Sequence, residues 1–269
     1  MNLPFNQDKF TQVWLNLWEQ TQEEAPPFSL HIFDTLASTN QHIWQILNTQ
    51  GKIHKPVAVI ALKQTGGKGQ WGRVWQSPRG GLYLSFALNL NLKSKDSLPL
   101  TLATAWGIAT TLRDYKIPVQ LKWPNDLILK SCKLGGILTE TRMQKNIITQ
   151  TVIGVGINWS NPVPEKAINL QSFCQQQSIT SITCLEVLAA ITLKGIFSGN
   201  QAYINERLEE LISSYSELLC TTGRSVTING IPGKVIGVDP NGQLKIRLTS
   251  SGATTEILCP PGTIRLGYD

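Results

Sequence analysis

A glycine-rich stretch, "TGGKGQWGRVW" at residues 65–75, has the composition of an anion-binding loop. Glycine lets backbone N–H groups approach a ligand closely, and Lys68 and Arg73 add positive charge. The letters G-K-G-Q-W-G at 67–72 match the fingerprint of dinucleotide-binding loops, and the valine at 74 extends the match to protein-kinase loops. The question is which anion such a loop holds.

Neither of these two phosphate-binding loops fits the residues that follow. A dinucleotide-binding loop opens a helix and is followed about 20 positions later by an acidic residue. Here Pro78 and Gly80 disfavour a helix, and the next acid is Asp96. The kinase motifs V-A-I-K, H-R-D and D-F-G are absent, and a Walker loop would need Ser or Thr where Gly69 stands. The loop is therefore either a different kind of anion site or an ordinary glycine-rich connection, and the basic and aromatic residues between its glycines favour the anion site.

Two later motifs carry further charged groups. "LKWPNDLIL" at 121–129 supplies a lysine and an Asn-Asp pair, and "CKLGGILTE" at 132–140 supplies a lysine before two glycines. Their order, after "STN" at 38–40 and "QTGGKGQWGRVWQSP" at 64–78 and before "GVGIN" at 154–158, resembles the catalytic core of biotin–protein ligases. The resemblance covers residues 29–160 closely, and 223–269 as the small C-terminal β-domain of that family.

The resemblance implies a two-step reaction with ATP and biotin as substrates and Mg²⁺ as the metal. Biotin carboxylate attacks the α-phosphate of ATP to give biotinyl-5′-AMP and pyrophosphate, and a lysine of a biotin carboxyl carrier protein, that of acetyl-CoA carboxylase, then displaces AMP. Such chemistry needs fixed positive charge where two anions meet, and it needs water kept from the anhydride.

Each candidate residue also has a simpler structural explanation. Most lone lysines are solvated surface charges, an Asn-Asp pair often forms a turn, and a Ser-Thr-Asn sequence caps a helix. By resemblance, catalysis falls to Lys133, Asp126 and Arg73. Biotin would be bound by Ser38, Thr39, Asn40, Gln64, Gly67, Lys68, Gly69, Gln70, Lys133, Gly135 and Gly136. ATP would be bound by Lys68, Arg73, Lys122, Asn125, Asp126 and Asn158, and Asp126 would be a ligand of Mg²⁺.

The loop departs from the family pattern, which is rich in arginine. Here Lys68, Gln70 and Trp71 replace three arginines, and Arg73 retains its guanidinium. Lysine is a point charge rather than a fork, so bidentate anion contacts are weakened at position 68. The loop has few apolar anchors besides Trp71, which predicts that it is mobile when empty and closes over the ligands.

Hydrophobic patterning indicates the elements that position these motifs. Helices are predicted within 1–28, at 38–51 and 100–115, with two more in 183–220, and strands at 29–36, 57–64, 80–90, 119–129, 133–141 and 147–159. Short β-rich runs separated by turns fill 223–269. We expect an α+β fold with a mixed or antiparallel central sheet and flanking helices, similar to the catalytic core of class II synthetases, plus an SH3-like β-barrel. The expected divisions are 1–28, 29–221 and 222–269.

Composition limits the classes of protein. The 269 residues carry a net charge of +6. Residues 35–95 contain no acidic residue, and their basic residues are Lys52, Lys55, Lys63, Lys68, Arg73, Arg79, Lys93 and Lys95. Such a stretch is either a solvated basic face or a site for anions. Five scattered cysteines without a C-x-x-C argue against disulfides and zinc, and no signal peptide or membrane span is visible, so a cytoplasmic protein is expected.

Two alternatives compete with biotin ligation. Lipoate–protein ligases share the fold and the adenylate strategy, but the K-W-P-N-D motif and the C-terminal β-domain favour biotin. Some ligases of this family also repress transcription through an N-terminal helix-turn-helix, which needs about three helices and a positive face. Residues 1–28 offer one helix, four acids and one lysine, so we expect no DNA binding. The sequence allows a monomer or a homodimer.

Overall fold

The computed structural model describes residues 5–51, 53–92, 97–205, 208–250, 252–264 and 266–267. Lys52, Lys93 and Lys95 of the basic stretch lie outside this part of the chain. The elements are α1 (Gln7–Glu19), β1 (Ser29–Phe33), α2 (Thr39–Gln50), β2 (Val57–Ala61), β3 (Leu82–Leu92), α3 (Leu98–Asp114), β4 (Gln120–Lys122), β5 (Asp126–Leu129), β6 (Cys132–Gln144), β7 (Ile147–Ile157), α4 (Leu170–Gln176), α5 (Leu185–Ile204), α6 (Leu208–Leu218), β8 (Ser225–Ile228), β9 (Ile231–Val238), β10 (Leu244–Ser250) and β11 (Ala253–Cys259).

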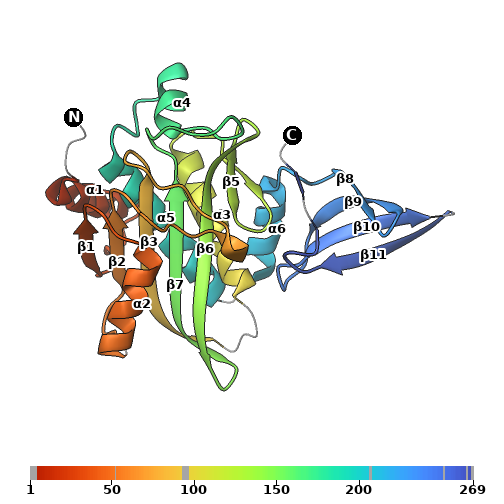
Figure 1. The fold of residues 1–269 in the computed structure, drawn as a ribbon, viewed down its shortest axis with the longest axis horizontal. Helices are drawn as coiled ribbons and strands as arrows, with labels where there is room; N and C mark the ends of the chain where they lie inside the picture. Colours follow the sequence, from red (N-terminus) through yellow and green to blue (C-terminus); the bar gives the residue numbers. More distant parts are fainter. Residues whose placement is uncertain are drawn as a thin grey trace.

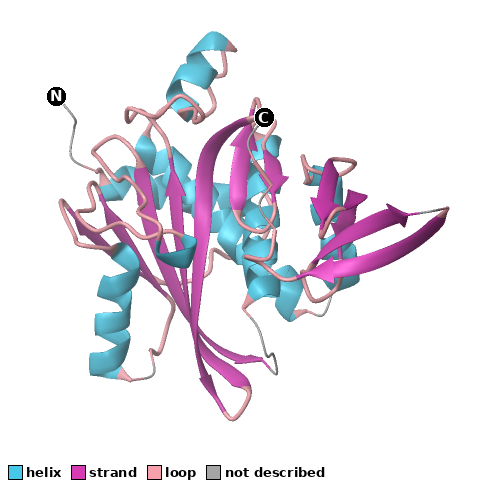
Figure 2. Ribbon diagram, turned by 45° about the vertical axis from the view of Figure 1, so that its right-hand side comes forward, coloured by secondary structure: helices cyan, strands magenta, loops and turns pink. Residues whose placement is uncertain are grey.

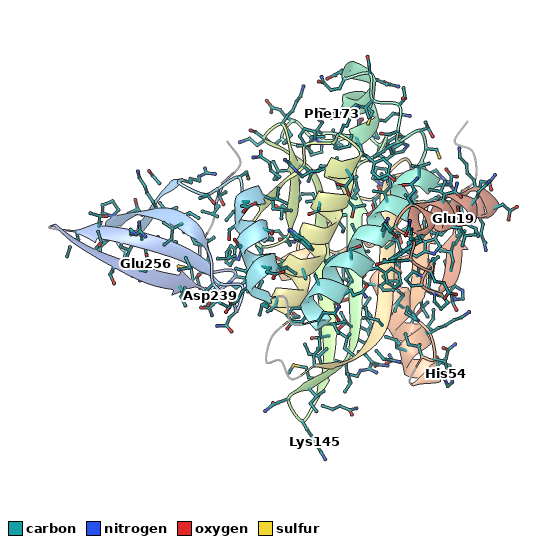
Figure 3. All side chains as sticks on the ribbon, turned by 180° about the vertical axis from the view of Figure 1, so that it is seen from behind. Glu19, His54, Lys145, Phe173, Asp239 and Glu256 are labelled. Atoms are coloured by element: carbon teal, nitrogen blue, oxygen red, sulfur yellow. The ribbon has the colours of Figure 1, made fainter. Side chains whose placement is uncertain are left out.

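The central sheet has seven strands in the order β1-β2-β3-β7-β6-β5-β4. Strands β1 and β2 are parallel, and the other neighbours are antiparallel, which confirms the predicted mixed sheet. Helix α2 lies on the side that faces the viewer in Figure 1, and Figure 3 shows α3 and α5 on the opposite side. The sheet is thus covered by helices on both faces, as Figure 2 also shows.

Two hydrophobic clusters hold these layers together. The larger one joins the α3–α5 face of the sheet to α1, which contributes Phe10, Trp14 and Trp18. The smaller one packs Ile43 and Leu47 of α2 against β2 and β7. Helix α3 is buried along most of its length, so its apolar character extends around the helix rather than along one stripe.

The structure differs from the predicted elements in two places. The single strand expected at 119–129 is divided into β4 and β5 by Trp123-Pro124-Asn125, where the Trp123–Pro124 bond is cis. Helix α4 was not predicted; it begins after Asn169, whose side chain accepts a hydrogen bond from the backbone N–H of Ser172. The other predicted helices and strands occur at their expected places, with boundaries shifted by a few residues.

The longest hairpin joins β6 to β7 through Lys145 and Asn146. Both residues have positive φ (50° and 61°), the conformation that a two-residue type I′ turn requires. Figure 3 shows Lys145 at the tip of this hairpin. The glycine-bearing opposite ends of β6 and β7 belong to the site described below.

The C-terminal strands form a separate antiparallel sheet in the order β11-β10-β9-β8. The predicted small β-domain is therefore confirmed, but the described residues form an open sheet: β8 and β11 are its two edges and do not pair with each other. A closed barrel would need that pairing. One link between this sheet and the central sheet is the hydrogen bond from the Trp123 Nε1–H to the carbonyl oxygen of Gly242, at 2.8 Å.

Candidate active site

A cavity of about 810 Å³ lies where the central sheet, the loop between β2 and β3, and the C-terminal segment meet. This volume is in the range of small-molecule sites. The residues that line it come from five stretches far apart in the sequence, 38–40, 64–75, 122–138, 154–156 and 261–267. Most of the predicted motifs therefore converge on one space.

Lys133 and Asp126 form an ion pair in this cavity, with Nζ and Oδ1 2.6 Å apart. The pairing of β5 with β6 explains why they meet: Asp126 is opposite Gly136 and Ile128 is opposite Lys133, with a bulge between. In a regular strand, residues three apart point to opposite faces; the bulge brings Lys133 and Gly136 to the same face. The bulge therefore creates the ion pair.

Aromatic and glycine residues surround this pair. The Lys133 ammonium lies 5.3 Å from the centre of the Trp75 ring, a cation–π distance. A side chain on Gly156 would overlap the Trp75 indole, and one on Gly135 would come within 2.6 Å of the Gly156 carbonyl oxygen. The absence of a side chain at Gly156 lets Trp75 lie against β7, beside the ammonium, and its absence at Gly135 lets β6 and β7 approach closely.

Lys122 is the second lysine of the site, opposite Asp126 in the β4–β5 pairing. The residue is 8% exposed. Burial lowers the pKa of Lys122 below 10.5, and the negative charge of Asp126 partly opposes this shift. A buried ammonium that has lost hydration gains from an anion bound next to it.

The loop between β2 and β3 folds as a small hairpin over the cavity. Lys68 and Val74 form an isolated bridge, and the Gly69 N–H donates to the Arg73 carbonyl oxygen at 2.7 Å. Trp71 adopts a left-handed conformation at φ 60° and is 66% exposed. Its ring lies within 3.3 Å of the point where a side chain of Gly262 would begin, so the loop reaches the C-terminal segment.

The start of α2 forms the other end of the cavity. Ser38 is the N-cap residue, as predicted, although its side chain makes no capping hydrogen bond. Thr39, Asn40 and Gln64 line the cavity. Thr39 and Asn40 are hydrogen-bonded to the buried Ser85 of β3, and the Gln64 side chain accepts from the Thr39 backbone N–H. These side chains are therefore held in fixed orientations.

Three of the predicted site residues do not line the cavity: Gly67, Gly135 and Asn158. Gly67 leaves room for Ser77 and the Trp75 carbonyl, and Gly135 for Gly156. The Asn158 side chain donates to the Lys133 carbonyl oxygen at 3.4 Å and accepts from Asn161 at 3.0 Å. Asn125 does line the cavity, but its amide donates to the Ile137 carbonyl oxygen at 2.8 Å, which ties it to β6. These contacts are structural.

Sequence reasoning missed other lining residues. Trp75, Trp123, Gly154 and Gly156 lie inside quoted motifs but were not selected; Trp123 is only 5% exposed and still forms part of the cavity wall. The segment 261–267 carries no motif, and no pattern in it could have indicated the site. Its place depends on how the C-terminal sheet docks.

The side chains fit magnesium when it arrives with a nucleotide. Among the described residues, no group of three or more His, Cys, Asp or Glu side chains is placed to hold a metal ion. Asp126 offers one carboxylate to the cavity. Magnesium commonly takes one or two carboxylates together with substrate phosphates.

Within the described part of the chain, no helix is long and apolar enough to cross a membrane.

Comparisons with known proteins agree with this geometry. The model of the biotin/lipoate A/B protein ligase family matches residues 32–158. The bifunctional ligase/repressor BirA of Escherichia coli is 31% identical over 222 residues, which cover 80% of this chain and 68% of that protein. BirA of Bacillus subtilis is 28% identical over 219 residues, covering 78% of this chain and 67% of its own length.

Solved structures show the same fold. A biotin protein ligase from Aquifex aeolicus, in complex with biotin and ATP, superposes with a TM-score of 0.66 at 24% identity and covers 86% of this chain and 99% of its own. The Leishmania major enzyme in complex with biotinyl-5-AMP gives 0.57 at 24% identity, covering 86% and 99%. The sequence relatives and the shared fold together establish that the chain belongs to the biotin/lipoate A/B protein ligase family.

Proposed function

We propose that the protein activates biotin with ATP to biotinyl-5′-AMP and transfers the biotinyl group to a lysine of a biotin carboxyl carrier protein. The observation that carries the proposal is the ion pair of Lys133 and Asp126 beside Lys122 in a cavity that the glycine-rich loop covers. Two anions meet in the first step, and fixed cations reduce their repulsion. The similarity to biotin–protein ligases supports biotin as the acid.

In the first step, a carboxylate oxygen of biotin forms a bond to the α-phosphorus while the bond to pyrophosphate breaks. Lys133 stands where it can contact both the carboxylate and the α-phosphate, and the Trp75 ring limits its movement. Lys122 provides a second cation for phosphate, and Arg73 and Lys68 add charge from the loop. Asp126 would hold the magnesium ion that accompanies ATP, and the ion would supply further positive charge beside the phosphates.

In the second step, the carrier lysine must arrive without its proton, because the neutral amine is the nucleophile. Its nitrogen bonds to the acyl carbon, AMP leaves, and the amine loses a proton. Asp126 is the carboxylate in the cavity that can accept this proton once ligand binding redistributes its contacts. The carrier must reach the cavity mouth, which lies beside the exposed Trp71 and Val74.

The deciding experiment incubates the purified protein with labelled biotin, Mg²⁺ and ATP, with and without an apo carrier domain. Adenylate without carrier, and labelled carrier when it is added, are the expected products. Lipoate replaces biotin in a parallel reaction; if lipoate drives pyrophosphate exchange better than biotin, the protein is a lipoate ligase. Absence of DNA binding remains a prediction, which a gel-shift assay on a palindromic operator tests in both low and high salt.

A further inference from the structure

A chain of hydrogen bonds runs from β6 to the end of the cavity formed by the start of α2. Glu140 accepts from the Asn40 amide at 2.8 Å and from the Trp44 indole N–H at 3.1 Å, both on the same oxygen, Oε2. Glu140 itself does not line the cavity, whereas Asn40 does. Any effect of Glu140 on a ligand must therefore pass through Asn40.

The orientation of Asn40 is set mainly by the carboxylate of Glu140 at 2.8 Å, since the Leu138 carbonyl oxygen, which also accepts from the Asn40 amide, is farther away at 3.4 Å. A carboxylate offers acceptors alone, so the NH₂ of Asn40 faces Glu140 and its Oδ1 faces β3. There Asn40 Oδ1 lies 2.5 Å from the Ser85 hydroxyl oxygen, and Ser85 is fully buried. Because Oδ1 can only accept, Ser85 gives its proton to Asn40.

The direction of the next bond follows from the single proton of a hydroxyl. Ser85 Oγ also lies 2.6 Å from Thr39 Oγ1. With the proton of Ser85 committed to Asn40, the proton between these two hydroxyls comes from Thr39. This arrangement leaves the longer contact, between Thr39 Oγ1 and Gln64 Oε1 at 3.2 Å, without a proton. The opposite arrangement would leave the much closer oxygens of Ser85 and Asn40, at 2.5 Å, with no proton between them.

Gln64 is oriented by the backbone. The Thr39 backbone N–H donates to Gln64 Oε1 at 2.8 Å, so the amide oxygen faces α2, and the Gln64 NH₂ donates to Ser77 Oγ at 2.9 Å. The oxygens of Thr39 and Gln64 at the cavity end thus have free acceptor capacity and no proton to give. A ligand that meets them must bring N–H donors.

We propose that Glu140 is a specificity-determining positioning residue, which fixes the direction of the hydrogen bonds through Asn40 and Ser85 so that Thr39 presents an acceptor to the cavity. This inference rests on the proposed function and specifies which chemical group of the substrate the site selects. The bicyclic urea of biotin carries two N–H groups, whereas the dithiolane ring of lipoate carries none. The network therefore favours a urea over a ring without donors.

The first test compares Glu140→Leu and Glu140→Gln with the wild type. Glutamine can present its carbonyl oxygen to both Asn40 and Trp44, so it should keep biotin affinity within about twofold. Leucine removes the nearer acceptor and leaves Asn40 with the 3.4 Å contact to the Leu138 carbonyl oxygen alone. Asn40 can then turn, which should weaken biotin binding about tenfold, the effect of one hydrogen bond. We expect the KM for biotin to rise while kcat at saturating biotin and the KM for ATP stay constant.

Inhibition by lipoate separates polarity from general damage to the pocket. Lipoate has no N–H to lose, so its inhibition constant against biotin should be the same in Glu140→Leu and in the wild type. Equal weakening of lipoate and biotin would mean that the pocket has changed shape, and unchanged biotin affinity would mean that Glu140 has no influence. Either result overturns the proposal. Trp44→Phe, which removes the other donor to Glu140, is the matched control and should bind biotin normally.

Exchanging the amide of Asn40 with the carboxylate of Glu140 tests the hydrogen bond between these side chains without removing it. Asn40→Asp places two carboxylates side by side and should weaken biotin binding; in Asn40→Asp with Glu140→Gln, the glutamine amide can donate to the new carboxylate. Recovery of affinity in the double variant supports the proposal, and a double variant as weak as Asn40→Asp refutes it. Biotin binding by calorimetry without ATP keeps the outcomes distinct: a wild type that fails to bind biotin contradicts the proposed function instead.

Discussion

Lys133 Nζ and Asp126 Oδ1 lie 2.6 Å apart because a bulge in the β5–β6 pairing turns Lys133 to the face that Asp126 occupies. Each charge is partly withdrawn from water, with side chains 27% and 13% exposed. The pair holds a cation in the cavity before any substrate arrives. An incoming anion replaces part of the negative charge with which Asp126 balances Lys133.

Lys133→Ala should lower biotin-dependent exchange of pyrophosphate into ATP by about 10²–10³, the usual loss when a charge-stabilising group is removed from a transition state. Lys130→Ala is the matched control: Lys130 is near in sequence, but its ammonium lies over the Phe173 ring, outside the cavity. Circular dichroism should show both variants folded. Exchange at the wild-type rate in Lys133→Ala would remove this residue from the mechanism.

The affinity for ATP should fall at alkaline pH because of Lys122. Burial lowers the pKa of Lys122 below 10.5. The side chain is charged below this lowered pKa and neutral above it, so its attraction for phosphate is lost as the pH rises through that value. Lys122→Arg keeps its charge above pH 12 and should bind ATP evenly over the same range. Parallel pH curves of ATP Kd for the two proteins would contradict the prediction.

Gly156→Ala should displace Trp75. The added methyl group overlaps the indole, and overpacking of this kind typically costs about 1–3 kcal/mol. We expect a lower Tm and weaker biotin binding, because Trp75 both lines the cavity and lies under Lys133. Gly66→Ala is the control, since its new methyl would meet the Ala37 carbonyl oxygen at an ordinary 3.4 Å. If both variants behave alike, the packing of Trp75 is not essential.

Trp71→Ala should loosen the loop that covers the cavity, because it removes the contact with Gly262. We expect trypsin to cut after Lys68 and Arg73 a few times faster in the empty protein, and biotin with ATP to slow this cleavage. Val74→Ala, in the same loop and 80% exposed, should cleave like the wild type. Mass spectrometry of the fragments gives the rates. If neither the substitution nor the ligands change the cleavage rate, the loop is a static connection.

Much of the fold could be predicted because most helices and strands show a clear hydrophobic pattern in their own residues. The helix predicted at 38–51 occurs as α2, which Gly51 ends with φ +71°, and β2 lies within the strand predicted at 57–64. The division of the 119–129 segment was missed, although the polar residues Lys122 and Asn125 flank Trp123-Pro124. The seven-residue helix α4 offers too short a pattern to detect.

The site residues that belong to sequence motifs were predicted. Those whose position depends on tertiary packing were missed. Lys133 and Asp126 were chosen from motifs, yet the bulge that joins them depends on the pairing of two strands. Asn158 was chosen by resemblance, but its side chain is used by Asn161 and the Lys133 backbone. Glu140 ends a quoted motif without having been selected, because its role depends on neighbours that approach from α2.

Pro261, Gly262 and Ile264, with Leu266 and Gly267, form a wall of the cavity that the ribosome adds after every other wall has been synthesised. Domains of a growing chain fold from the N-terminus onward, so the central sheet and its charged pair can form while this wall is still absent. Until these residues emerge, the cavity lacks one of its walls. The order of synthesis therefore makes this wall the last part of the cavity to be completed.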